Sequence, residues 1–288
     1  MKTYVINLSS VVTTDIKECF SAFEELLRKY SIRFCPGCCF FTPWTDQLWL
    51  KYTFFNNKDL IDDYNQGIII TEEFLGELLK IFGFQREFSP LEKDKKNIID
   101  SRNDFYSTEN RSDRWMGPQE IASALLEQAW KAMQVWGEES KKRLRTILQQ
   151  AQEEGAEVVF MSNTNPLHID YFLRQTHEEF GFVSTDDVNV HATVYDEACK
   201  QTPILVIGEH PHVSIALSYR FGLGKTGDPK NGQSILSKLS ESYQGAEIIV
   251  LSQYDADLQE AERLGLPHQK TDVFLAQCDK KEGEVFVL

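Results

Sequence analysis

The sequence predicts an α/β protein built on a parallel β-sheet that is covered by helices on both faces. In the second half of the chain, short β-branched and apolar runs alternate with helical patterns, which is typical of parallel strands joined by helices. Near the start, residues 3–12 form another such run and predict a buried strand. At 288 residues, the chain is long enough for one large domain or for a core domain with a sizeable insertion.

The first half of the chain is mainly helical in pattern. Apolar residues recur at helical spacing in four segments, between which lie an aromatic-rich stretch and a highly charged one. The expected helical segments are 15–30, two within 58–82 on either side of the turn Asn65-Gln66-Gly67, and 118–154. Gly155 is expected to end the last of them. The charged stretch, at about 85–115, predicts a polar linker or an exposed insertion.

The second half alternates strands with helices. Asn165-Pro166 is a favourable N-cap and first-turn pair for a helix that we expect to end near Phe180. The expected strands are 156–162, about 188–195, 203–208 and 247–252. Two further helices are expected, at about 230–243 and about 256–264.

The charge balance excludes several classes of function. The chain has 30 Lys and Arg residues against 44 Asp and Glu residues, a net charge of −14. Such an acidic surface disfavours general binding to nucleic acids or to anionic membranes, because phosphate groups are repelled. No apolar run approaches the ~18–20 residues that span a bilayer, and the N-terminus lacks the apolar core of a secretory signal. Six cysteines, four of them within residues 19–39 and two far apart, do not form the dense framework of a small secreted domain, so we expect a reducing compartment and a cytoplasmic protein.

Four segments lie where the carboxyl ends of the strands would meet, which is where parallel α/β sheets bind ligands. The first strand ends in Asn7-Leu8-Ser9-Ser10-Val11, and the next ends in Ser162-Asn163-Thr164-Asn165-Pro166. A glycine-rich segment, Gly222-Leu223-Gly224-Lys225-Thr226-Gly227-Asp228-Pro229, supplies a lysine. The last strand ends in Ser252-Gln253 and precedes a helix that closes with Ala261-Glu262-Arg263-Leu264-Gly265.

In order and spacing, these segments resemble the motifs of the haloacid dehalogenase-like (HAD) superfamily. The segment from Tyr64-Asn65-Gln66-Gly67 to Thr71-Glu72-Glu73-Phe74-Leu75 is similar to the cap helices of its helical-cap subgroup. The resemblance implies an HAD-like, doubly wound parallel sheet with an inserted helical cap. The core domain would comprise residues 1–14 and 150–288, and the mainly helical cap would comprise residues 15–149.

The chain departs from the family pattern where the family carries acids. In the family, the first strand ends in Asp-x-Asp, whose first Asp is the nucleophile and whose second, in the phosphatases, is the general acid/base. Asn7 and Ser9 stand at these positions. The Asp-Asp of the last motif, which helps to hold Mg²⁺, is replaced by Ser252-Gln253, whose neutral oxygens suit a hard cation poorly. The resemblance therefore implies a catalytically degenerate protein with no metal or other cofactor.

The residues that still match the family form a candidate anion site. Ser162, Asn163 and Lys225 would meet the first amides of the helix that starts at Pro166, and would bind a phosphate group without a metal ion. We therefore expect a protein that acts by binding, either to a phosphorylated small molecule or, through the cap, to a protein partner. An alternative stays open, in which Ser162 and Lys225 are inherited structural residues without a ligand.

A second hypothesis keeps hydrolysis. Asp257 lies five residues beyond Ser252 and is the one acid expected near the site, while Asp228 follows the lysine. A divergent phosphatase-type hydrolase would use one of these acids, with weakly bound Mg²⁺. One carboxylate is too few for a metal site, so binding is favoured over turnover.

Four other patterns are weaker candidates. Gly222–Gly227 lacks the first glycine of a P-loop, and residues 213–221 before it have a helical pattern. Cys35-Pro36-Gly37-Cys38 resembles a redox pair or half a zinc site, but its aromatic neighbours favour cysteines of the core. His210-Pro211-His212 is typical of a surface loop. The aromatic cluster within residues 40–55 predicts a cap core or, if it is exposed, a protein-binding surface.

Overall fold

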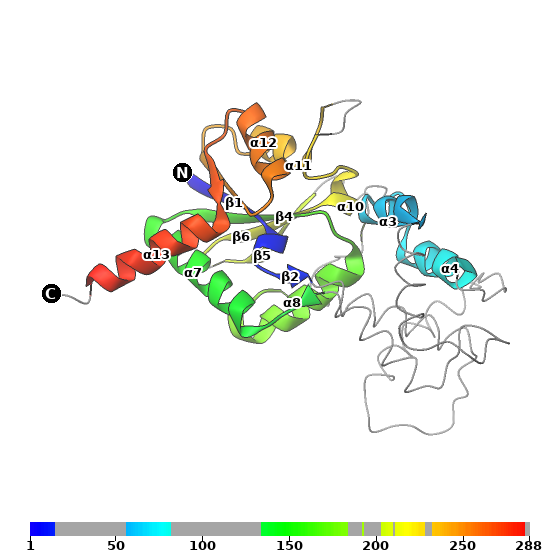
Figure 1. The fold of residues 1–288 in the computed structure, drawn as a ribbon, viewed down its shortest axis with the longest axis horizontal. Helices are drawn as coiled ribbons and strands as arrows, with labels where there is room; N and C mark the ends of the chain where they lie inside the picture. Colours follow the sequence, from blue (N-terminus) through cyan, green and yellow to red (C-terminus); the bar gives the residue numbers. More distant parts are fainter. Residues whose placement is uncertain are drawn as a thin grey trace, which may run out of the picture. The chain divides into compact units, whose positions relative to one another are not determined.

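The computed structural model describes residues 1–14, 56–81, 134–183, 192, 203–209, 211–227 and 232–285. The chain divides into two compact units, one formed by Met1–Asp15, Asp59–Ile70 and Met133–Leu288, and the other by Ile16–Lys58 and Thr71–Ala132. The first unit contains a six-stranded sheet (Figure 1). Within the second unit, helix α4 (Thr71–Ile81) buries Phe74 and Leu75.

The sheet has the strand order β5-β6-β4-β1-β7-β8. Its strands are β1 (Lys2–Asn7), β4 (Glu157–Ser162), β5 (Ile204–Gly208), β6 (Val213–Leu217), β7 (Glu247–Ser252) and β8 (His268–Lys270). Neighbouring strands pair in parallel, except that β5 runs antiparallel to β6 at the edge. After β1, a short 3-10 turn, η1 (Leu8–Ser10), leads to β2 (Thr13–Thr14), which pairs with β3 (Gln134–Val135). The mostly parallel sheet confirms the predicted α/β fold.

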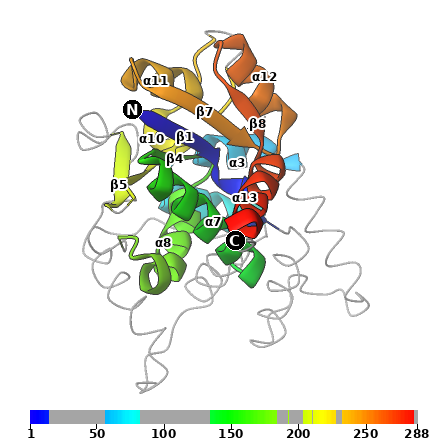
Figure 2. The same ribbon diagram turned by 90° about the vertical axis from the view of Figure 1, so that its left-hand side faces the viewer.

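Helices cover both faces of the sheet (Figure 2). On one face lie α7 (Glu138–Glu154), α8 (Pro166–Phe180) and α13 (Thr271–Val285). On the other lie α11 (Ile235–Ser242) and α12 (Asp255–Arg263). Side chains of β1 alternate between the two cores, with Tyr4 and Ile6 in the first and Val5 in the second. Burial on both faces explains why the strands are almost continuously apolar.

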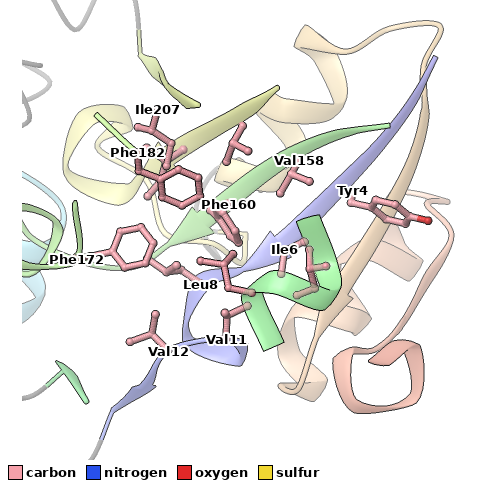
Figure 3. Close-up of a cluster of buried hydrophobic side chains, with 14 of the residues drawn as sticks. Tyr4, Ile6, Leu8, Val11, Val12, Val158, Phe160, Phe172, Phe182 and Ile207 are labelled. Carbon is pink, nitrogen blue, oxygen red and sulfur yellow. The ribbon is translucent and has the colours of Figure 1, made fainter. Parts of the chain in front are cut away.

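The first of these cores is rich in aromatic rings (Figure 3). Phe172 of α8 packs against Phe160 of β4 and against Phe182, with ring centroids 6.5 and 6.2 Å apart. Such pairs contribute about 0.5–1.5 kcal/mol beyond the area that they bury. The core therefore fixes β1 and β4, whose carboxyl ends carry the candidate site.

Two helix ends form at the residues that the sequence predicts. Asn165 is the N-cap of α8, and its Oδ1 accepts a hydrogen bond from the His168 amide at 3.1 Å. Pro166 follows in the first turn, where its missing N–H costs nothing. Gly155 ends α7 in the left-handed conformation, with φ +59°.

The helical prediction for residues 213–221 is wrong for residues 213–217 and is confirmed only for residues 218–221. These residues form strand β6 and then the short helix α10 (Ser218–Phe221). All five residues of β6 are buried, with Val213 and Ile215 in one core and Ala216 in the other. A strand that is covered on both faces shows no polar alternation, so its pattern does not distinguish it from a buried helix.

Several expected elements lie outside the described residues. They are helix 15–30, the charged stretch at 85–115, residues 118–133 of the expected helix 118–154 and, apart from residue 192, strand 188–195. The prediction of one continuous helix over 118–154 is wrong, because Gln134–Val135 forms strand β3 and Gly137 is the N-cap from which α7 starts. The expected core boundary at residue 150 falls within α7, and the first unit resumes at Met133. Within the described residues, no helix combines the length and the apolar character that a membrane span requires.

Candidate functional site

The central strands end at one edge of the sheet. β1 pairs in parallel with β4 on one side and with β7 on the other, and Asn7 lies beside Met161 in the first pairing. Asn7, Ser162 and Ser252 are the last residues of these three strands. All three side chains are buried. The strand order thus brings residues that are far apart in the sequence to the edge where α/β sheets bind ligands.

Asn7 is held at both ends of its side-chain amide. Its Oδ1 accepts a hydrogen bond from the Ser9 amide at 3.0 Å. Its Nδ2 donates to Asp257 Oδ2 at 2.5 Å and lies 3.5 Å from Ser252 Oγ. Ser252 Oγ donates to the same Asp257 oxygen at 2.6 Å. Asn7, Ser252 and Asp257, which we call the strand-end network, therefore satisfy one another's buried polar groups.

Lys225 lies next to the strand-end network. Its Nζ is 3.9 Å from Asp257 Oδ2 and 5.2 Å from the centroid of the Tyr254 ring, and its side chain is only 14% exposed. Burial lowers the pKa of the Lys225 ammonium below its ordinary value, and the charge of Asp257 opposes this shift. Lysine and carboxylate thus form a partly desolvated ion pair.

Asn163 connects the end of β4 to the lysine loop, residues 222–227. Its Oδ1 accepts a hydrogen bond from the Lys225 amide at 2.8 Å. Ser162, one residue earlier, is 4% exposed. The predicted anion ligands therefore come from adjacent strand-end segments, and Asn163 fixes the backbone of the lysine.

The start of α8 offers fewer free amides than the sequence suggests. Pro166 has no N–H group, and the amides of His168 and Ile169 donate to the side chain and to the carbonyl of Asn165, at 3.1 and 3.3 Å. Two of the first amides of α8 are therefore occupied, and Lys225 places a full positive charge next to the strand-end network.

Ser9 and Gln253 contribute to the site through their backbones. The Gln253 amide donates to Ser10 Oγ at 3.0 Å, and its carbonyl accepts from Lys270 Nζ at 2.7 Å. Within the described part of the chain, its side-chain Nε2 is buried without a hydrogen-bond partner. Neither residue has an ionisable side chain, so neither supplies a general acid or base.

The donor set does not suit Mg²⁺, the ion that the family motifs imply. Magnesium prefers several oxygen ligands with carboxylates among them. The described part of this edge offers the carboxylate of Asp257, whose Oδ2 already accepts from Asn7 and Ser252 and faces Lys225. Among the residues that the structure describes, no cluster of three His, Cys, Asp or Glu side chains could hold a metal ion. Asp228 lies outside them.

Glu260 of α12 anchors the far end of the lysine loop, a role that the sequence analysis missed. Its carboxylate accepts hydrogen bonds from Ser234 Oγ and from Nε and Nη2 of Arg263, each at 2.7 Å, and from the Gly227 backbone. The hydrogen bonds from Arg263 hold the pKa of Glu260 below its ordinary value, although burial acts in the opposite direction. The i, i+3 spacing of Glu260 and Arg263 on a helix is the signal that could have indicated this pair.

The turn Asn65-Gln66-Gly67, which follows α3 (Lys58–Asn65), is fixed to the same edge. Asn165 Nδ2 donates to Asn65 Oδ1 at 3.1 Å, and Ser218 Oγ donates to the Asn65 carbonyl. Gly67 has φ +70°, and a Cβ atom there would lie 2.2 Å from the carbonyl oxygen of Tyr219. Only glycine allows this approach.

The remaining sequence candidates form no second site in the described residues. His212 Nε2 lies 3.3 Å from Ser214 Oγ on β6, and among the described residues it belongs to no group of three potential metal ligands. Cys278 is a buried cysteine of α13. His210, the motif at Cys35–Cys38 and the aromatic cluster within 40–55 lie outside the described residues.

Solved structures of HAD proteins match most of the chain. The HAD family enzyme BT-2542 from Bacteroides thetaiotaomicron matches with a TM-score of 0.51 at 14% identity, over 94% of this chain and 93% of that one. The magnesium complex of the same enzyme matches with a TM-score of 0.50 at 15% identity, over 94% and 92%. The sequence matches no protein-family model, and no curated protein sequence is significantly similar to it. Together with the strand order, these structural matches show that the chain has the haloacid dehalogenase-like fold.

Proposed function

We propose that this HAD-like protein acts by binding a phosphorylated small molecule rather than by hydrolysing one. The observation that carries the proposal is the strand-end network, in which both polar atoms of the Asn7 amide are engaged. A neutral amide is not a nucleophile, so no covalent aspartyl intermediate can form at this position. The chemistry of the fold family is therefore lost at its first step.

Lys225 and the end of β4 support binding of a phosphate group. The ammonium is mostly buried, and a charge in such surroundings interacts more strongly with an anion than it would in water. Ser162 adds a hydroxyl at the adjacent strand end, and Asn163 holds the lysine backbone. Since Lys225 itself supplies the positive charge, the site needs no metal ion.

Hydrolysis through Asp257 is the competing function. One oxygen of its carboxylate, Oδ2, accepts hydrogen bonds from Asn7 and Ser252 at 2.5 and 2.6 Å and lies 3.9 Å from Lys225 Nζ. These interactions stabilise the carboxylate charge and so lower its nucleophilicity. A protein partner bound through the cap is the other form of the binding hypothesis, and the cap aromatics on which it depends lie outside the described residues.

Calorimetric titration and a turnover assay on the purified protein test the proposal together. Inorganic phosphate in EDTA should bind the wild type and should bind Lys225→Ala at least about tenfold more weakly, because a charge-assisted hydrogen bond is lost. Lys238→Ala, which changes a lysine paired with Glu241 on α11, is the control. With Mg²⁺ and an aryl phosphate, no variant should turn over. Mg²⁺-dependent turnover in the wild type that Lys225→Ala abolishes would contradict the proposal and support the hydrolase.

A further inference from the structure

Tyr254 presents an aromatic ring at the rim of the candidate site. It lies two residues after the end of β7 and is exposed, with 46% of the residue accessible, whereas Asn7, Ser252 and Asp257 are buried. Its amide donates to Ser252 Oγ at 3.0 Å, so its backbone is fixed by the strand-end network. Its ring centroid lies 5.2 Å from Lys225 Nζ. The exposed ring is therefore placed next to the cation that would hold a phosphate.

The position of Tyr254 in the helix is unfavourable for stability. It is the N-cap of α12, and it makes no side-chain capping hydrogen bond. Ser, Thr, Asp or Asn at an N-cap is favoured over residues that cannot cap. A tyrosine at this position makes no capping hydrogen bond, and its aromatic ring is exposed to solvent. This combination points to a role other than the packing of α12.

We infer that the ligand of this site carries a planar ring, which stacks on Tyr254 while its phosphate contacts Lys225, as in a nucleoside monophosphate. This inference rests on the proposed function, since it uses the same phosphate site. Aromatic side chains stack on bases with little preference among them, because every base has a π-face. Tyr254 thus sets the class of ligand, and Lys225 provides the contact that all phosphate esters share.

The test compares two phosphate monoesters that differ only in the base. Adenosine monophosphate and ribose 5-phosphate are titrated calorimetrically, in EDTA, into the wild type, Tyr254→Phe and Tyr254→Ala. Wild type and Tyr254→Phe should bind the nucleotide about 5- to 100-fold more tightly than the sugar phosphate, the range expected for one stacked base. In Tyr254→Ala, this ratio should fall close to one. Because the ratio is taken within each variant, a general loss of stability affects both ligands alike.

The titrations distinguish a failure of the stacking role of Tyr254 from a failure of the phosphate site. If both esters bind the wild type with equal affinity, or if Tyr254→Ala keeps the preference for the nucleotide, the stacking role is overturned while the phosphate site stands. If neither ester nor inorganic phosphate binds the wild type, the proposed function and this inference are both overturned.

Discussion

Asn7 places a neutral amide beside a buried carboxylate at the end of β1. Its Nδ2 lies 2.5 Å from Asp257 Oδ2. A carboxylate in place of the Asn7 amide would be repelled by Asp257 at this distance. An amide donates a hydrogen bond at this position instead, and Ser252 donates a second one to the same oxygen. The carboxylate of Asp257 is thereby held without a metal ion.

Asn7→Asp should therefore destabilise the protein at neutral pH, by about 3 kcal/mol, since it places a second buried carboxylate beside Asp257. The loss should be smaller at pH 5, where one carboxyl of the pair is protonated, and smaller when Mg²⁺ is added. Urea denaturation at the two pH values measures it. The control is Asn163→Asp, an exposed residue whose oxygen can still accept from the Lys225 amide. A cost for Asn7→Asp that depends on neither pH nor Mg²⁺ would contradict this view of the network.

Asp257→Asn should strengthen phosphate binding, by about tenfold, because it removes the anion that competes for Lys225 at 3.9 Å. The asparagine oxygen can still accept from Asn7 and Ser252, so the network is kept. Calorimetric titration in EDTA checks this, with Asp255→Asn as the control, since exposed Asp255 pairs with Lys270 instead. Weaker phosphate binding in Asp257→Asn would show that Asp257 is part of the binding site.

For single residues, the sequence predicts which ones lie at the strand ends, because the carboxyl ends of parallel strands meet at one edge of the sheet. It does not predict that Asp257 bonds to Asn7, since that contact depends on how the first turn of α12 is placed against β1. Glu260 is missed for the same reason. Its partners Ser234 and Gly227 lie some 30 residues away and become neighbours only in the folded chain.

Hydrogen bonds connect the lysine loop, residues 232–235 and α12. The Ile235 amide donates to the Gly224 carbonyl at 2.9 Å, and Arg263 Nη2 donates to the Gly232 carbonyl at 3.2 Å. Glu260 accepts hydrogen bonds from the Gly227 backbone, at the end of the loop, and from Ser234 Oγ, just before α11. The orientation of Lys225 therefore depends on α12 as well as on β4.

Glu260→Gln should cost more stability at pH 7 than at pH 3. Hydrogen bonds from Arg263 keep the pKa of Glu260 below its ordinary value in the folded state, so the ionised form stabilises the fold above the unfolded-state pKa. This contribution is lost as the pH falls through the folded-state pKa. Urea denaturation over this pH range measures the difference in unfolding free energy between wild type and variant, with Glu262→Gln, an exposed neighbour, as control. A difference that stays constant with pH would contradict the ion pair.

Gly67→Ala tests how the turn after α3 is fixed. A Cβ atom would lie 2.2 Å from the Tyr219 carbonyl oxygen, and φ is +70°, so we expect a loss of at least about 2 kcal/mol. Gly155→Ala is the matched control, because its φ is +59° and no atom lies within 4 Å of its Cβ position. That variant should lose about 1 kcal/mol, from backbone strain alone. Equal losses of stability in the two variants would show that the close approach to Tyr219 is absent.

The elements that the sequence predicts well are those with local signals. Asn165-Pro166 starts α8 and Gly155 ends α7, as expected from side-chain capping and from left-handed backbone. Strand β6 was missed because both of its faces are buried, and burial is decided by the helices that the tertiary fold supplies.

For the molecule as a whole, the acidic excess is not found at the described strand ends. The net charge of −14 disfavours polyanions over the surface, while the described strand ends carry neutral Asn7, Ser162 and Ser252 beside one Lys225–Asp257 pair. A small anion that reaches Lys225 meets a local environment that the overall composition does not reveal. Fold class follows from the alternation of strands and helices, whereas the proposed phosphate binding rests on a few contacts at one edge of the sheet.

A crystal structure of the wild type soaked in inorganic phosphate and EDTA tests whether the strand ends bind phosphate without a metal ion. We predict phosphate within hydrogen-bond distance of Lys225 Nζ and Ser162 Oγ, with Asn7 still bonded to Asp257 and no metal ion at the strand ends. An empty site at Lys225, or phosphate that appears only when Mg²⁺ replaces EDTA, would contradict metal-free binding.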